Sequence, residues 1–134
     1  MALSGFDDTE GLTYIGGGRF VLVEERLQDV YRLTYAAAGS TSRAALPTAS
    51  LGPTVGNIGI EGLCFDRVSG RFVAVKEKTP QAALDFTVDF DAGTAPVSDL
   101  FVPNLGVLDL SDVQVLSSVA SLQGTAAADN LLLY

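Results

Sequence analysis

Residues 10–26 read EGLTYIGGGRFVLVEER, and residues 61–78 read EGLCFDRVSGRFVAVKEK. These stretches are two copies of one unit, because their opening glutamates lie 51 residues apart and their phenylalanines after the turn lie 52 apart. Each copy has a short β-prone run, a turn containing glycine and a second run rich in Phe and Val. That order is typical of a β-hairpin with a loop of about three to five residues. The sequence therefore predicts a repeated unit built from strands.

The hydrophobic pattern changes from strand to strand within each unit. Residues 20–23 and 72–75 are apolar without alternation, which predicts a strand buried on both faces. The next runs, at 30–35 and 83–90, alternate apolar and polar residues, and a short outer strand is expected around residues 43–46. Burial that decreases outward is what radial stacking of four-stranded blades produces. The predicted fold class is all-β, a fragment of a β-propeller.

A third unit is expected to begin at residues 108–115, where Asp112 lies 51 residues after Glu61. Its buried second strand is predicted at residues 131–134, after a longer turn over residues 117–130. The chain would then be a single partial propeller domain of about two and a half four-stranded blades. The predicted units are approximately residues 8–57, 58–107 and 108–134 within the domain 1–134.

Open blade edges are expected to promote self-association, because stacked repeats need capping or closure to cover their terminal faces. For the same reason we expect the complete protein to be longer than this chain. A closed ring would have on the order of four to eight blades.

Composition excludes several classes of function. The 134 residues include 16 acidic and 8 basic side chains, for a net charge of -8, so a nucleic-acid backbone would be repelled. The chain contains no histidine, which excludes a Ser-His-Asp triad or a histidine-ligated metal centre built from this chain alone. Cys64 is the single cysteine, so no internal disulfide can form, and its apolar surroundings predict a buried thiol. No apolar run approaches the roughly 20 residues that a membrane-spanning helix needs.

Four glutamates recur at matching positions of the two units. Glu10 and Glu61 precede the innermost strands, while Glu25 and Glu77 close the second strands. One carboxylate from each position could therefore face the central channel of a propeller. Oxygen ligands that converge on an axis suit Ca²⁺, so these four residues are candidate calcium ligands. Calcium-dependent propeller lactonases and esterases offer a similar geometry by fold-level analogy.

The same glutamates also have a structural interpretation. Glu10 and Glu61 would accept hydrogen bonds from backbone amides of adjacent loops. Glu25 and Glu77 would form ion pairs across blades with the basic residues that follow them.

The glycines at residues 16–18 are expected to form a hairpin turn rather than a phosphate cradle, because neither a helix pattern nor a lysine follows them.

An ordered set of short motifs resembles the SdiA-regulated family of bacterial proteins. The motifs are DTEGLTY at 8–14, VEER at 23–26, GIEGLCFD at 59–66, KEKTP at 76–80 and DLSD at 109–112. The resemblance implies a six-bladed propeller related to NHL-repeat proteins, located in the bacterial envelope or periplasm, with no established reaction. Two departures are Thr79, where asparagine is usual, and the long segment 117–130.

Two functional classes follow from these observations. The favoured one is a binding or scaffold module for a small molecule or protein, with an acidic central channel that holds a calcium ion. The alternative is a metal-dependent hydrolase of the esterase, lactonase or phosphoesterase type, which without histidine would depend on carboxylates and a metal.

Overall fold

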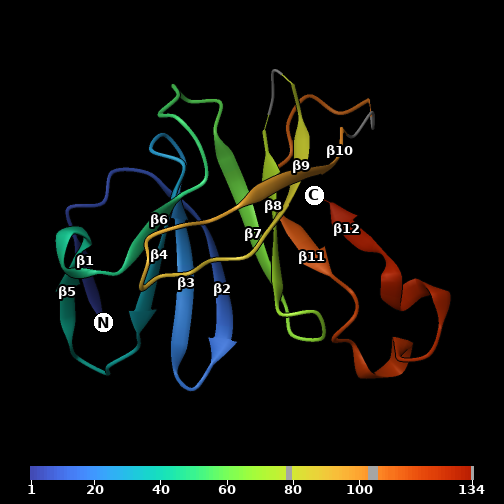
Figure 1. The fold of residues 1–134 in the computed structure, drawn as a ribbon, viewed down its shortest axis with the longest axis horizontal. Helices are drawn as coiled ribbons and strands as arrows, with labels where there is room; N and C mark the ends of the chain where they lie inside the picture. The colour runs from blue at the N-terminus through green and yellow to red at the C-terminus, as the bar shows by residue number, and fades with distance from the viewer. Residues whose placement is uncertain (78–79, 103–105, 134) are drawn as a thin grey trace.

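The computed structural model describes residues 1–77, 80–102 and 106–133 (Figure 1). Over these residues the fold is all-β, as predicted, and contains three short 3₁₀ helices but no α-helix. The first four-stranded sheet has the order β2-β3-β4-β6 and the second has the order β10-β9-β8-β7. Their strands are β2 (Thr9–Gly16), β3 (Arg19–Glu24), β4 (Asp29–Thr34), β6 (Thr48–Ser50), β7 (Ile60–Asp66), β8 (Arg71–Lys76), β9 (Ala82–Phe86) and β10 (Val97–Phe101).

Smaller elements flank these sheets. A third unit contains the antiparallel pair β11 and β12, and the N-terminal strand β1 pairs in parallel with β5. In Figure 1 the two large sheets stand side by side, with the third unit beyond the second sheet. The bounds are β1 (Ala2–Ser4), β5 (Ser40–Ser42), β11 (Val113–Val115), β12 (Leu131–Leu133), η1 (Arg43–Ala45), η2 (Ala120–Leu122) and η3 (Ala126–Asp129).

The two predicted hairpins are confirmed, with the predicted difference in turn length. Residues 16–18 join β2 to β3, and all three glycines have positive φ, which suits glycine because it has no Cβ. The turn between β7 and β8 is one residue longer. There Gly70 has a φ of 73°, and the Asp66 side chain accepts hydrogen bonds from the amides of Val68 and Ser69.

The first sheet packs face to face on the second through one apolar core. The central strands β3 and β8 are buried on both faces, as the unbroken apolar runs predicted. The core combines Val21, Val23, Val30 and Ala49 of the first sheet with Ile60, Leu63, Phe72, Ala74 and Phe86 of the second. Val88 and Phe90 pack against this core from beyond the end of β9, so the predicted strand at 83–90 is shorter than expected.

The outer parts of the units differ from the prediction in two places. Residues 43–45 form the helix η1 rather than a strand, because this turn lets Arg43 reach the buried carboxylate of Glu24. The outer strand of the first sheet is β6 instead, which pairs with β4. The second difference is β10, which forms inside the second predicted unit where the sequence pattern indicates no strand.

The third unit has the predicted pair of strands, but its register is shifted by one residue. The Phe65 amide donates to Thr13 Oγ1 at 3.0 Å, and the Val115 amide donates to Cys64 Sγ at 3.3 Å. Thr13 and Cys64 are equivalent positions of the first two units, and each side chain accepts a backbone amide from the unit that follows. The two donors are therefore also equivalent, so Val115 corresponds to Phe65, 50 residues before it. Ser111 rather than Asp112 therefore corresponds to Glu61.

Burial in the third unit is also lower than predicted. Leu132 of β12 is 44% exposed, so this strand is not fully buried. The whole arrangement is consistent with a fragment of a propeller, while a six-bladed ring and the unit boundaries remain predictions.

Replacement of Gly11 by alanine tests the packing of the two sheets. A Cβ at Gly11 would lie 2.8 Å from the Leu63 Cβ and 2.9 Å from the Leu63 amide nitrogen. We expect Gly11→Ala to lower the free energy of unfolding by about 1–3 kcal/mol, because a packed core resists added volume. Urea denaturation measures the change. Gly56→Ala is the matched control, since a Cβ there meets nothing within 4 Å. Equal stabilities of the two variants would contradict the close packing.

Candidate functional site

Three of the four predicted glutamates meet at the interface between the two sheets. One carboxylate oxygen each from Glu25, Glu61 and Glu77 lies within 4.8 Å of the others. Glu25 follows β3 of the first sheet, Glu61 lies in β7, and Glu77 follows β8. Glu25 is almost fully buried, at 1% exposure, and the other two are partly buried. We call these three residues the acidic cluster.

Backbone hydrogen bonds fix the position of the cluster. The Glu25 amide donates to the Asp8 carbonyl at 2.9 Å, and the equivalent Glu77 amide donates to the Gly59 carbonyl at 3.1 Å. The Gly59 amide in turn donates to Glu25 Oε1 at 3.0 Å. A Cβ at Gly59 would lie 2.2 Å from the Glu25 carbonyl oxygen, so this approach requires glycine. The bond to the Glu25 side chain links the end of the first sheet directly to the entry of the second.

The close carboxylates change their own ionisation. Burial raises the pKa of Glu61 to about 7, and the charges of Glu25, Glu10 and Glu77 and a hydrogen bond with Glu25 add to the effect. Both causes disfavour the charged form, because desolvation and like charges penalise an ionised carboxylate. The cluster therefore holds a proton at neutral pH more readily than isolated glutamates would.

Glu10, the fourth predicted ligand, lies at the edge of this group rather than inside it. Burial raises the pKa of Glu10, followed by a hydrogen bond with Asp8 and by the charges of Asp8, Glu25 and Glu77. Asp8 is also paired with Arg26 at 2.9 Å. Glu10 and Asp8 thus add negative charge beside the acidic cluster.

The structural interpretation of the glutamates expects backbone amides to bind Glu10 and Glu61 and an ion pair to form at Glu25. The structure instead shows a backbone amide, that of Gly59 in the adjacent loop, bound to Glu25. Arg26, however, contacts Asp8 and the Asn57 side chain, so its ion pair is made with the first unit's own entry loop. The expected partner of Glu77, Lys78, lies outside the described residues.

Glu24 is a buried acidic residue that the sequence analysis did not single out. It is 1% exposed, and both of its oxygens accept hydrogen bonds from Arg43 Nη1 at 3.0 Å. The Asp7 amide donates a further bond to it at 2.9 Å. Successive side chains of a strand point to opposite faces, so the adjacent Glu24 and Glu25 enter different environments. This alternation was the sequence signal that distinguishes Glu24 from Glu25. It does not identify the partner of Glu24, because Arg43 is 19 residues away.

The predicted buried thiol of Cys64 is confirmed. Cys64 is a free, buried cysteine, and burial raises its pKa. Its sulfur accepts the Val115 amide and so joins the second sheet to the third unit. The thiol therefore serves packing and does not belong to the acidic cluster.

Comparison with known proteins identifies the family. The family model described as SdiA-regulated matches residues 1–134, the whole chain, so the protein belongs to the SdiA-regulated family. Neither a curated protein nor a solved structure gives a match. Over the described ranges, none of the helices has the length and apolar character that crossing a membrane would require.

The raised pKa of Glu61 predicts a measurable pH dependence of stability. The folded-state pKa of about 7 exceeds the ordinary value of 4.5, so the unfolded chain loses this proton at lower pH than the folded protein. The contribution to stability is therefore fully present below about pH 4.5 and is lost as the pH rises through 7. In metal-free buffer, Glu61→Gln should flatten the fall in unfolding free energy between these two pH values.

Urea titrations at several pH values measure this slope, and Asp99→Asn, at an exposed carboxylate, is the control. Identical slopes for the native chain and Glu61→Gln would show that Glu61 ionises normally.

Proposed function

We propose that this protein is a binding module whose acidic cluster holds a divalent cation, with Ca²⁺ as the preferred ion. The observation that carries the proposal is the spacing of the oxygens of Glu25, Glu61 and Glu77, within 4.8 Å of one another. Calcium binds oxygen ligands at about 2.3–2.6 Å, so two ligands of one ion lie up to about 5 Å apart. The cluster therefore has the separation that a shared calcium ion needs.

Electrostatics supports the same proposal. The three carboxylates repel one another, and Glu10 and Asp8 add charge nearby. A bound divalent cation would offset this repulsion and favour the ionised form of Glu61. Ion binding would then release a proton near neutral pH, so affinity should increase as the pH rises.

A cation at this position would also link the two sheets. Glu25 belongs to the first unit, whereas Glu61 and Glu77 belong to the second. Binding would therefore stabilise the interface between the sheets and present a charged centre to a small molecule or protein ligand. A bacterial envelope or periplasmic location fits this proposal, because calcium modules outside the cytoplasm work with dissociation constants of about 0.1–1 mM.

Calcium addition is the direct test. Ligand binding to the folded state alone raises the free energy of unfolding by RT ln(1 + [L]/Kd), which is about 1.4 kcal/mol at ten times Kd. We expect millimolar Ca²⁺ at pH 8 to raise the Tm of the protein by several degrees and excess chelator to reverse the change. Isothermal titration calorimetry should give one ion per chain, with weaker binding of Mg²⁺ because Mg²⁺ dehydrates reluctantly.

Glu61→Gln should weaken calcium binding at least tenfold, while Asp99→Asn should leave it unchanged. If neither Ca²⁺ nor chelator shifts the Tm of the native chain, the acidic cluster is not a cation site.

A second function, metal-dependent hydrolysis, is favoured by one specific observation. Glu61 is only partly buried, and its carboxylate lies within 4.8 Å of those of Glu25 and Glu77, as a general base beside a shared cation requires. Beside a cation held by Glu25 and Glu77, this carboxylate could take a proton from water. The substrates would be esters, lactones or phosphoesters.

The hydrolase proposal predicts turnover that depends on added metal. Nitrophenyl ester or lactone hydrolysis should require Ca²⁺ and fall about 100-fold or more in Glu61→Gln, because general base catalysis contributes about 10²–10⁴-fold. A spectrophotometric assay at pH 8 measures it, with Asp99→Asn as the control. Absence of turnover across a panel of esters, lactones and phosphoesters would exclude this function and leave the binding proposal intact.

A further inference from the structure

Two exposed arginines lie at the turns of the two large hairpins. Arg19 follows the glycine turn between β2 and β3, and Arg67 begins the turn between β7 and β8. In Figure 1 these turns lie at the same end of the two neighbouring sheets. The acidic cluster lies at the opposite end of the strands, because Glu25 follows the end of β3 and Glu61 is near the start of β7. We call Arg19 and Arg67 the arginine pair.

Both guanidinium groups of the arginine pair lie beside the glycine turn. Arg19 Nε donates to the Gly16 carbonyl oxygen at 3.4 Å, and a Cβ at Gly17 would lie 3.6 Å from the same nitrogen. Arg67 reaches this turn from the second sheet, since a Cβ at Gly16 would lie 3.7 Å from Arg67 Nη2. Two positive charges are therefore gathered around one turn, although like charges repel each other.

Tyr14 holds Arg67 in this position. The Arg67 Cζ lies 5.5 Å from the centroid of the Tyr14 ring, within the range of a cation–π contact. The Tyr14 hydroxyl accepts a hydrogen bond from the Gly18 amide at 3.3 Å, which ties the ring to the same turn. The Arg67 guanidinium is thus placed before a ligand arrives, and such preorganisation lowers the entropic cost of binding.

The arginine pair differs from the other arginines of the chain in having no carboxylate partner. The four arginines that form ion pairs with Asp or Glu are Arg26, Arg32, Arg43 and Arg71. Among the described residues, Arg19 and Arg67 form none, although the chain has 16 acidic side chains and only 8 basic ones. The positive charge at the glycine turn is therefore not neutralised within the described part of the chain.

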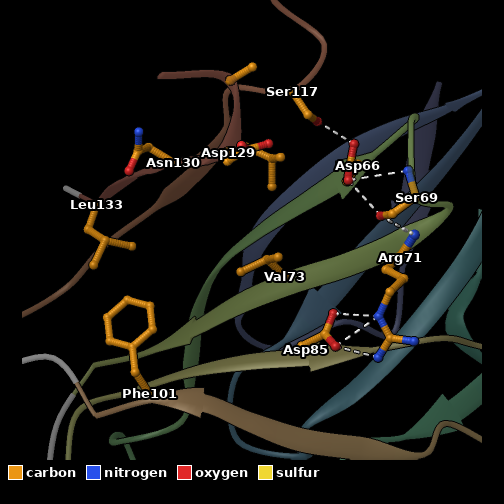
Figure 2. Close-up of a pocket in the computed structure, with 12 residues that line it drawn as sticks. Asp66, Ser69, Arg71, Val73, Asp85, Phe101, Ser117, Asp129, Asn130 and Leu133 are labelled. Carbon is orange, nitrogen blue, oxygen red and sulfur yellow. Dashed lines mark hydrogen bonds and ion pairs between the residues drawn. The ribbon is translucent and has the colours of Figure 1, made fainter. Parts of the chain in front are cut away.

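The carboxylates closest to Arg67 along the hairpin are bound to other groups (Figure 2). The Asp66 carboxylate accepts hydrogen bonds from two serine hydroxyls. Both oxygens of Asp85 accept hydrogen bonds from Arg71 Nε at 2.8 Å. These contacts keep the two acids on other partners and leave Arg67 available to a ligand.

We propose that the arginine pair binds a phosphate group at the glycine turn. A planar guanidinium donates two parallel N–H bonds to phosphate oxygens. A phosphate monoester has about two negative charges at neutral pH and three acceptor oxygens, so it accepts hydrogen bonds from both arginines at once. A carboxylate has two oxygens, and a single bidentate arginine already occupies both.

The glycines allow the phosphate to approach. None of residues 16–18 has a side chain that would cover the turn, and a Cβ at Gly18 would meet nothing within 4 Å. The turn is a hairpin turn, as predicted, so the arginine side chains rather than a backbone cradle supply the positive charge. Such a group is supplied either by a soluble phosphomonoester or by a lipid headgroup.

Titration with inorganic phosphate, followed by NMR in excess chelator at neutral pH and constant ionic strength, tests the site. The amide signals of Gly16, Gly17 and Gly18 and the Nε signals of the arginine pair should shift in a saturable manner. Acetate should bind about tenfold more weakly or less, because it offers one fewer oxygen and one fewer charge.

Arg67→Gln should weaken phosphate binding about tenfold or more, because charge-assisted bidentate hydrogen bonds are strong. Arg32→Gln is the matched control, since it removes the same charge from an arginine that is paired with Asp91. Unchanged signals far from each substitution establish that both variants are folded.

Vesicles distinguish the two sources of the phosphate group. Cosedimentation with phosphatidylcholine vesicles that contain phosphatidic acid, abolished by Arg67→Gln and absent without phosphatidic acid, assigns the group to a lipid. Saturable binding of inorganic phosphate without cosedimentation assigns it to a soluble ligand.

The proposal is overturned if phosphate gives no saturable shift at the turn and Arg67→Gln cosediments with the vesicles as the native chain does. Equal weakening by Arg32→Gln and Arg67→Gln also overturns it, because the anion would then respond only to net charge. Equal affinity for acetate excludes a phosphate site. Chelator is present throughout, so none of these outcomes depends on a cation at the acidic cluster.

Discussion

The close approach of β2 to β7 is the constraint on which the rest of the structure depends. Gly11 lies against the backbone and side chain of Leu63, at a distance that leaves no space for a Cβ. The approach brings the apolar faces of two sheets into one core, which supplies the main favourable term in folding. It also brings the end of β3 to the entry of β7, where Gly59 binds the Glu25 side chain. The acidic cluster is therefore a product of sheet packing rather than of any single loop.

Packing at this interface holds together charges that would otherwise separate. The neighbouring residues Glu24 and Glu25 show two ways in which a buried carboxylate is accommodated. Glu24 has Arg43 as a counter-ion, so its burial is compensated within the first unit. Glu25 instead accepts a backbone amide and lies beside two further carboxylates at the interface. Carboxylates gathered in this way are costly for stability and are typical of sites that bind ligands.

Local sequence signals account for the parts of the fold that were predicted correctly. Glycine turns followed by Phe-Val runs specify the hairpins β2–β3 and β7–β8 without help from the rest of the chain. The strands β6 and β10 were missed, because each forms by pairing with an inner strand and carries little pattern of its own. The register of the third unit was also missed, since it is set by the hydrogen bond from Val115 to Cys64.

The candidate site, like the fold, was predicted from the sequence only in part. The repeat predicted that four glutamates, Glu10 among them, would converge, and three of the four do so, without Glu10. The pairing of Glu24 with Arg43 depends on the turn of η1 and has no signal in the repeat. Equivalent positions need not have equivalent environments. Leu12 and Leu63 occupy the same place in their strands, yet Leu12 is 62% exposed and Leu63 is 3% exposed, because only Leu63 faces a neighbouring sheet. The role of a residue in this fold is therefore set by its unit's neighbour as much as by its own unit, and ligand sites are expected where two units meet.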